Sequence, residues 1–151
     1  VTNRESAEST IEHKSNLDSH YHSIYYVQEF IDTGKKDIRA FVLGEEVVGA
    51  AYRESDHWIT NAARGGKSKP YPITNEMEDL VRETSKVFGG GALAVDLLES
   101  DRGLLVNEIN CSMEFKESMK AIEEDIPSKL LDYTISQAEG AEEVTQTKCL
   151  V

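Results

Sequence analysis

Two short apolar segments, residues 93–98 and 104–110, lie so close together that they strongly restrict how this chain can fold. The first reads Leu-Ala-Val-Asp-Leu-Leu and the second Leu-Leu-Val-Asn-Glu-Ile-Asn, and both are rich in residues that are common in strands. The connector from Glu99 to Gly103 is polar and ends in glycine. This pattern predicts an antiparallel β-hairpin.

The predicted hairpin carries polar side chains that share a face. Because side chains alternate between the two faces of a strand, Glu108 and Asn110 lie on one face, and Asp96 can reach that face from the first strand. Carboxylate and amide oxygens suit Mg²⁺, which binds one or two carboxylates together with substrate phosphates. An acid among apolar strand residues needs a charged partner or a metal. The sequence therefore predicts a magnesium site that handles a nucleotide, with solvated carboxylates on an ordinary hairpin as the alternative.

Composition excludes several classes of protein. The chain has 151 residues, enough for one domain with a core, and its formal net charge of −12 argues against a nucleic-acid partner. No apolar stretch approaches the ~20 residues of a membrane span, so we expect a cytoplasmic protein without a membrane partner. Cys111 and Cys149 are too few for a disulfide framework. Cys111 is more simply a small buried packing residue than a nucleophile.

The rest of the chain mixes helices with strands. We expect helices over 5–14, 75–88 and from 126 to about 138, the second of them capped by Thr74. We expect strands over 25–31, 37–43 and 46–52, with a further strand around Trp58. Most strand pairs are joined by short turns, which indicates an α+β fold with a mostly antiparallel sheet and flanking helices. Residues 139–151 are polar and aperiodic, and we expect a frayed tail there.

Five motifs occur in a characteristic order. They are Val27-Gln28-Glu29-Phe30-Ile31, Asp37-Ile38-Arg39, Asn61-Ala62-Ala63-Arg64-Gly65-Gly66, Asp96 and Asn107-Glu108-Ile109-Asn110. In this order they resemble the ATP-grasp carboxylate–amine ligases of the RimK type, over roughly residues 1 to 136. Within that family the strings at 57–61, 94–99 and 113–116 are most similar to the branch that works in lysine biosynthesis.

The resemblance implies roles for individual residues. Gln28, Glu29, Phe30 and Ile31 would form the strand that holds adenine, Asp37 would lie near the ribose, and Arg39 would reach the phosphates. Arg64 would neutralise the transferring phosphate, and Asn61 and Lys116 would contact the substrates. Asp96, Glu108 and Asn110 would hold one or two Mg²⁺ ions that bridge the phosphates of ATP.

The resemblance also implies an activity and an extent. A carboxylate would attack ATP, and an amine would capture the acyl phosphate to form an amide. The amine would belong to an acidic amino acid, α-aminoadipate, and the carboxylate to a small acidic amino-group carrier protein. Val1 is not an initiator methionine, and we expect residues 1–138 to be the C-terminal portion of an ATP-grasp domain whose N-terminal domain and Gly-rich lid lie outside this sequence and which would be inactive by itself.

Other hypotheses stay open at this stage. A RimK-type enzyme could add glutamate to a ribosomal protein or another peptide-like acceptor, and a related enzyme could use glutamate in arginine biosynthesis. A non-enzymatic acidic module could bind Ca²⁺ or simply expose these carboxylates to solvent. Assembly into a homo-oligomer is also open.

Overall fold

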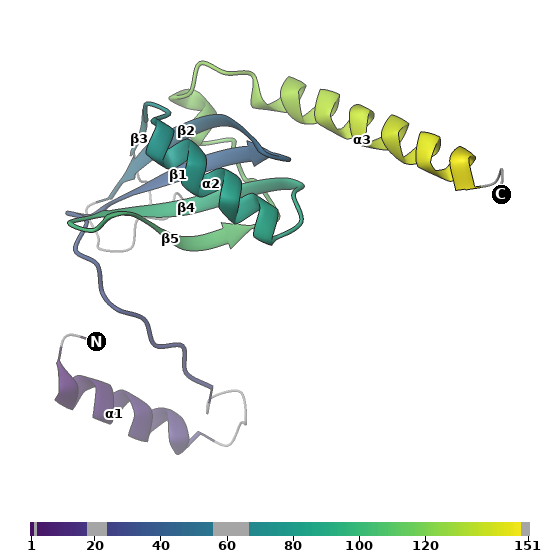
Figure 1. Ribbon diagram of the computed structural model, residues 1–151. Coiled ribbons are helices and arrows are strands. Elements are labelled where there is room, and N and C mark those ends of the chain that lie inside the picture. Colours follow the sequence, from purple (N-terminus) through teal and green to yellow (C-terminus); the bar gives the residue numbers. More distant parts are fainter. Residues whose placement is uncertain (2, 18–23, 56–66, 149–151) are drawn as a thin grey trace. The chain divides into compact units, whose positions relative to one another are not determined.

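The computed structural model describes residues 1, 3–17, 24–55 and 67–148, with side chains as far as residue 140 (Figure 1). The chain divides into two compact units, Val1–Phe30 and Ile31–Val151. Both hairpins, the helix after Thr74 and the antiparallel sheet are present, so the predicted α+β fold is confirmed.

The first unit contains helix α1, Arg4–Ser15, which begins at Asn3. The Asn3 side chain accepts a hydrogen bond from the Ser6 amide, and the Ser6 hydroxyl lies 3.2 Å from the Asn3 amide, which together form a capping box. Helix α1 has no buried residue. At its other end the Tyr25 hydroxyl donates to the Ile11 carbonyl oxygen.

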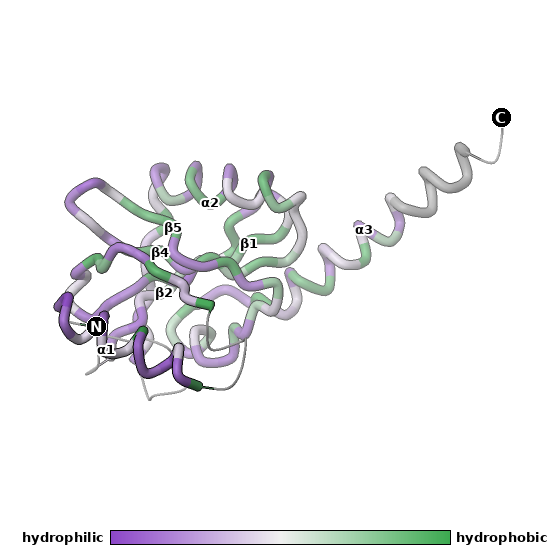
Figure 2. The backbone as a smooth tube through the Cα atoms, turned by 90° about the horizontal axis from the view of Figure 1, so that it is seen from below, coloured by the Kyte–Doolittle hydropathy of each residue, from purple (hydrophilic) through white to green (hydrophobic). Residues whose placement is uncertain are grey.

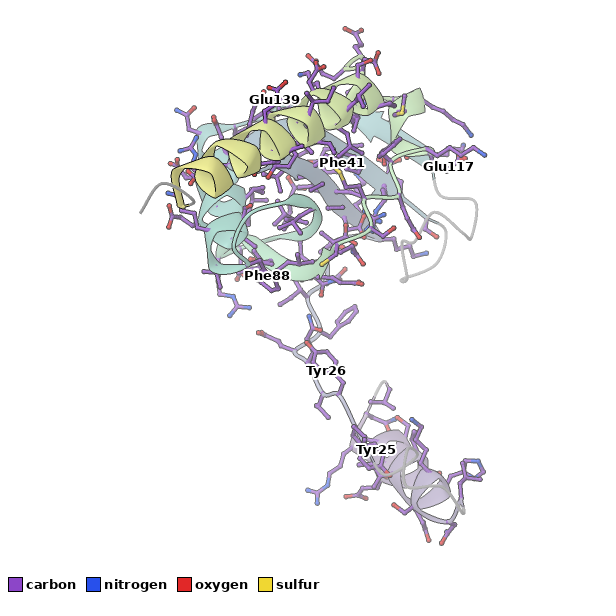
Figure 3. All side chains as sticks on the ribbon, turned by 90° about the vertical axis from the view of Figure 1, so that its right-hand side faces the viewer. Tyr25, Tyr26, Phe41, Phe88, Glu117 and Glu139 are labelled. Atoms are coloured by element: carbon purple, nitrogen blue, oxygen red, sulfur yellow. The ribbon has the colours of Figure 1, made fainter. Side chains whose placement is uncertain are left out.

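The strand predicted over residues 25–31 is wrong, because the structure has an extended segment there without strand hydrogen bonding. Its apolar side chains are exposed: Tyr26 and Val27 are each 87% exposed and Phe30 is 69% exposed. Figure 3 shows the Tyr26 side chain on this segment. A strand exists only with a neighbouring strand to pair with, and a sequence pattern cannot say whether that neighbour is present.

The second unit is built on a five-stranded antiparallel sheet with the order β3-β2-β1-β4-β5. The strands are β1 Lys36–Leu43, β2 Glu46–Glu54, β3 Lys67–Pro70, β4 Ala92–Ser100 and β5 Gly103–Asn110. The turn between β1 and β2 needs Gly44, whose φ of 63° is unfavourable for residues with a side chain. Strand β3 was not predicted, and the strand expected around Trp58 lies outside the described residues.

Helix α2, Asn75–Val87, covers one face of the sheet (Figure 1). Thr74 caps it as predicted, by accepting a hydrogen bond from the Met77 amide. Met77 and Val81 face the sheet one turn apart and are fully buried against the even-numbered side chains of β1, such as Ile38 and Val42. This apolar stripe on an otherwise polar helix holds α2 on the sheet, and Figure 2 shows the hydrophobic strands beneath it.

The opposite face is covered by the 3₁₀ turn η3, Ser118–Lys120, and the start of helix α3, Ile126–Lys148. Phe41, on the odd-numbered face of β1, is fully buried there in a cluster with Ile126 and Met113 (Figure 3). Pro127 stands in the first turn of α3, where a missing amide hydrogen costs nothing. The charged residues described below lie on this same face.

Helix α3 does not end near Ala138 as expected, because it continues to Lys148. Residues such as Ala, Glu, Gln and Lys favour a helix, and the single Gly140 does not interrupt it. In the part of the chain that the structure describes, no helix is both long enough and apolar enough to cross a membrane.

We predict that Phe41→Ala destabilises the protein by about 3–5 kcal/mol, because a fully buried aromatic ring leaves a cavity between the sheet and α3. Urea unfolding measures this free energy. Val87→Ala, at a residue that is 83% exposed, is the control and should change it by about 0.5 kcal/mol or less. Equal effects of the two substitutions would contradict the assigned core.

Candidate metal and nucleotide site

The candidate site lies on three neighbouring strands whose register is fixed by backbone pairing. Arg39 on β1 lies opposite Asp96 on β4, and Asp96 lies opposite Glu108 on β5. Two residues along, and therefore on the same face, Ala94 lies opposite Asn110. Residues directly opposite each other in antiparallel strands share a face, so the three predicted metal ligands point to the same side of the sheet.

A β-bulge follows the pair Asp96 and Glu108, because the next paired residues are Leu97 and Val106. The extra residue is Asn107. Bulges bend a strand and redirect its side chains, and they are common beside functional sites. The bulge lets the Asn-Glu-Ile-Asn string keep Glu108 and Asn110 on the site face while the apolar start of β5 pairs in a different register.

Asp96 is buried, with 3% of its surface exposed, and it is held by arginine. Arg39 donates from Nε to Oδ1 and from Nη2 to Oδ2, each over 2.8 Å. Paired, parallel hydrogen bonds of this kind are the strongest contact between arginine and a carboxylate. The acid predicted to need a charged partner has one.

A second ion pair lies beside the first. Arg53 on β2 lies opposite Asp37 on β1 and donates to both of its carboxylate oxygens, over 2.6 and 2.5 Å. Arg53 Nη2 is also 3.0 Å from Asp96 Oδ2. Asp37, Arg39, Arg53 and Asp96 therefore form one buried, charge-balanced group, which we call the ion cluster.

Burial by itself lowers the pKa of Arg53, but the hydrogen bonds that Arg53 donates to Asp37 and the negative charge of Asp96 outweigh it and raise that pKa. Arg53 consequently stays charged, and each charge in the cluster has a partner. Such a cluster tolerates burial only while it is complete, because removal of one member leaves an uncompensated charge.

Two predicted ligands remain available beside the ion cluster. Glu108 is exposed and forms no ion pair with any described residue. Asn110 has a buried Nδ2 atom without a hydrogen-bond partner. Buried amide groups are normally paired, and this N–H donor calls for an acceptor oxygen, such as one of a phosphate, rather than for a cation.

These residues fit a magnesium ion whose coordination is completed by other molecules. No three His, Cys, Asp or Glu side chains in the described ranges are arranged to hold a metal by themselves. Mg²⁺ commonly keeps several waters and takes one or two carboxylates together with substrate phosphates. Asp96, Glu108 and the oxygen of the Asn110 amide would hold it on that basis.

The structure describes some of the other predicted site residues and not others. Arg64 and Asn61 lie outside the described residues. Gln28, Glu29 and Phe30 belong to the first unit, and Ile31 is the first residue of the second. Lys116 is exposed, and Cys111 is exposed and free, so its predicted burial is wrong.

Sequence reasoning missed Arg53. A regular hairpin about Gly44 and Glu45, in which Leu43 pairs with Glu46, would place Tyr52 rather than Arg53 opposite Asp37. A bulge between Phe41 and Val42 shifts the register by one residue and brings Arg53 there instead. The only signal in the sequence is a lone arginine at the end of an apolar strand, which is usually a solvated surface residue.

Among solved structures, the fold is similar to that of the ATP-grasp ligase PsnB complexed with a minimal precursor. The TM-score is 0.60 at 24% identity, over 74% of this chain and 36% of that chain. The structure therefore has an ATP-grasp fold. Residues 1–134 match the family described as the RimK-like ATP-grasp domain, and the chain belongs to that family.

Named relatives are similar in sequence as well. The alpha-aminoadipate–LysW ligase LysX of Sulfolobus acidocaldarius is 36% identical over 82% of this chain and 46% of its own length. The tetrahydromethanopterin:alpha-L-glutamate ligase of Methanococcus maripaludis is 37% identical over 78% of this chain and 41% of its own length. The chain thus spans less than half the length of these relatives.

We predict that Arg53→Met destabilises the protein by about 3–5 kcal/mol, because Asp37 loses its paired donors inside the sheet face. The charge-balanced variant Asp37→Asn/Arg53→Met should cost clearly less. Urea unfolding of both variants gives the comparison. Lys69→Met, which removes the exposed ion pair with Glu54, is the control and should cost at most about 1 kcal/mol. A single variant as stable as the double variant would contradict a buried ion cluster.

Proposed function

We propose that this chain carries the metal and phosphate site of an ATP-dependent carboxylate–amine ligase. Membership of the RimK-like ATP-grasp family supports a ligase. The observation that carries the proposal is the shared face of Asp96, Glu108 and Asn110, fixed by the pairing of β4 with β5. No covalent enzyme nucleophile is required.

The reaction proceeds in two displacements. A substrate carboxylate attacks the γ-phosphorus of ATP and ADP leaves, which gives an acyl phosphate. The amine then attacks the acyl carbon, phosphate leaves and the amine loses a proton, which gives the amide. Bound Mg²⁺ supplies charge neutralisation on the phosphates.

This chain's own residues would orient the nucleotide and neutralise the charge of its phosphates. Asp96 and Glu108 would hold the cation, while the Arg39 guanidinium at the edge of the ion cluster would attract phosphate oxygens, to which its forked donors are suited. Arg64, followed by two glycines that let a ligand approach the backbone closely, would stabilise charge on the transferred phosphate. Gln28 to Ile31 would contact adenine, with Asp37 near the ribose.

The favoured substrates are α-aminoadipate as the amine and a carrier protein's glutamate as the carboxylate, in the cytoplasm. Relatives named LysX are alpha-aminoadipate–LysW ligases, and three of them match at 35–37% identity. The exposed cation Lys116 is suited to an acidic amino acid. Glutamate is the alternative amine, because relatives named ArgX and alpha-L-glutamate ligase also match.

We predict that Glu108→Gln weakens magnesium-dependent ADP binding by about tenfold or more, because the site loses one of its two carboxylates. Isothermal titration of the longest natural form of the protein that contains this chain, with and without Mg²⁺, measures the effect. The control is Glu123→Gln, which neutralises an exposed glutamate outside the site. If wild-type protein binds ADP no better with Mg²⁺ than without it, the proposed metal site is wrong.

The same protein should form an amide faster with α-aminoadipate than with glutamate when carrier protein and ATP are supplied. Release of phosphate and the mass of the modified carrier together measure the reaction. A preference for glutamate would replace the favoured substrate with the alternative and leave the ligase assignment intact. Phosphate release without amide formation under either amine would count against ligation.

A further inference from the structure

The Asp96 carboxylate is closed to a cation in this structure. Arg39 donates from Nε to Oδ1 and from Nη2 to Oδ2, each over 2.8 Å, so one guanidinium binds both oxygens. The Asp96 side chain is only 4% exposed. Each oxygen keeps a second lone pair, but a cation that used it would lie close to the guanidinium, and like charges repel strongly where there is little water. Asp96 can therefore take part in a metal site only if Arg39 moves away from it.

Of the two arginines beside Asp96, Arg39 is the one that can leave. In the part of the chain that the structure describes, all its polar contacts are with Asp96. Arg53 donates two hydrogen bonds to Asp37, so its departure would leave a second buried carboxylate without compensation. When Arg39 leaves, by contrast, Asp96 keeps an ion contact with Arg53, whose Nη2 lies 3.0 Å from Oδ2.

The phosphates of a nucleotide can give Arg39 a new partner. Its forked donors fit a phosphate as well as a carboxylate, and both fits use two parallel hydrogen bonds. The Arg39 side chain is 11% exposed against 6% for Arg53, so Arg39 lies closer to the surface from which a ligand arrives. A cation on Asp96 would then replace the positive charge that Arg39 withdraws, and the carboxylate would stay neutralised.

We propose that Arg39 is a positioning residue that exchanges partners: it holds Asp96 while no nucleotide is bound, and it turns to the phosphates when a cation takes its place on Asp96. This inference rests on the proposed metal and nucleotide site, and adds to it the residue that couples the two ligands. Because Arg39 competes with the cation only while no phosphate is bound, the protein binds the cation weakly by itself and tightly with nucleotide. The coupling is reciprocal, since each ligand raises the affinity for the other by the same factor.

The test measures the affinity for Mn²⁺, a cation that suits oxygen ligands and that electron paramagnetic resonance detects. The longest natural form of the protein that contains this chain is titrated without nucleotide and again with saturating ADP, with a correction for the Mn²⁺ that ADP binds in solution. In Arg39→Met the nucleotide-free protein should bind Mn²⁺ about tenfold more tightly than wild type, because no guanidinium competes for Asp96. The ADP-bound protein should change by less than about threefold, because Arg39 has already left Asp96 in wild type.

Two further variants make the comparison specific. Arg82→Met removes the same charge from helix α2, on the opposite face of the sheet, and should leave both affinities unchanged. Arg39→Lys keeps the positive charge, but its single ammonium group cannot bind both carboxylate oxygens side by side. It should raise the nucleotide-free affinity in the same direction and by less, and it decides the question if Arg39→Met does not fold.

The outcomes that would overturn the inference differ from those that would remove the metal site. An equal rise of both affinities in Arg39→Met would mean that Arg39 stays beside the cation and only repels it. No rise in a folded variant, or wild-type protein that binds Mn²⁺ equally well with and without ADP, would mean that Arg39 does not compete for Asp96. Wild-type protein that binds no Mn²⁺ in either state would remove the proposed metal site itself.

Discussion

The candidate site depends on the backbone register of β1, β4 and β5. Asp96 lies 57 residues after Arg39 in the sequence, and Glu108 lies 12 residues after Asp96. In the sheet the three nevertheless form one row across three strands. Because the period of a strand is two, a slip of one residue in either ladder would send one of these side chains to the α2 face. The apolar residues that alternate with them, Ile38 and Val95 among them, fix the register by their burial under α2.

The site face of the sheet has two parts with different energetics. Around Phe41 it is apolar and packs against Met113 and Ile126. Around Asp96 it is ionic, and four buried charges balance each other. Apolar packing contributes stability, whereas a buried ion cluster contributes little net stability and is costly when incomplete. Arg39 and Arg53 together hold the Asp96 carboxylate in one orientation on this face.

Both bulges of the sheet affect this face. The bulge in the β1–β2 ladder, between Phe41 and Val42, brings Arg53 opposite Asp37, and the bulge after Asp96 lets Glu108 and Asn110 share a face with it. The hairpin pattern predicts the second arrangement in outline, since alternation alone places Glu108 with Asn110. It cannot predict the first, because a bulge leaves no clear trace in an apolar strand and a regular hairpin would have placed Tyr52 there.

The sequence by itself determined the local elements and the identity of the acidic residues. Thr74 begins α2, Gly44 makes the tight turn, and apolar alternation marks both hairpins, because each of these signals acts within a few residues. Only the tertiary structure decided that Arg39 and Arg53 share Asp96, and that residues 25–31 form no strand. The physical reason is that ion pairs and strand ladders need a partner from elsewhere in the chain, and the partner's position follows from packing and register rather than from local pattern.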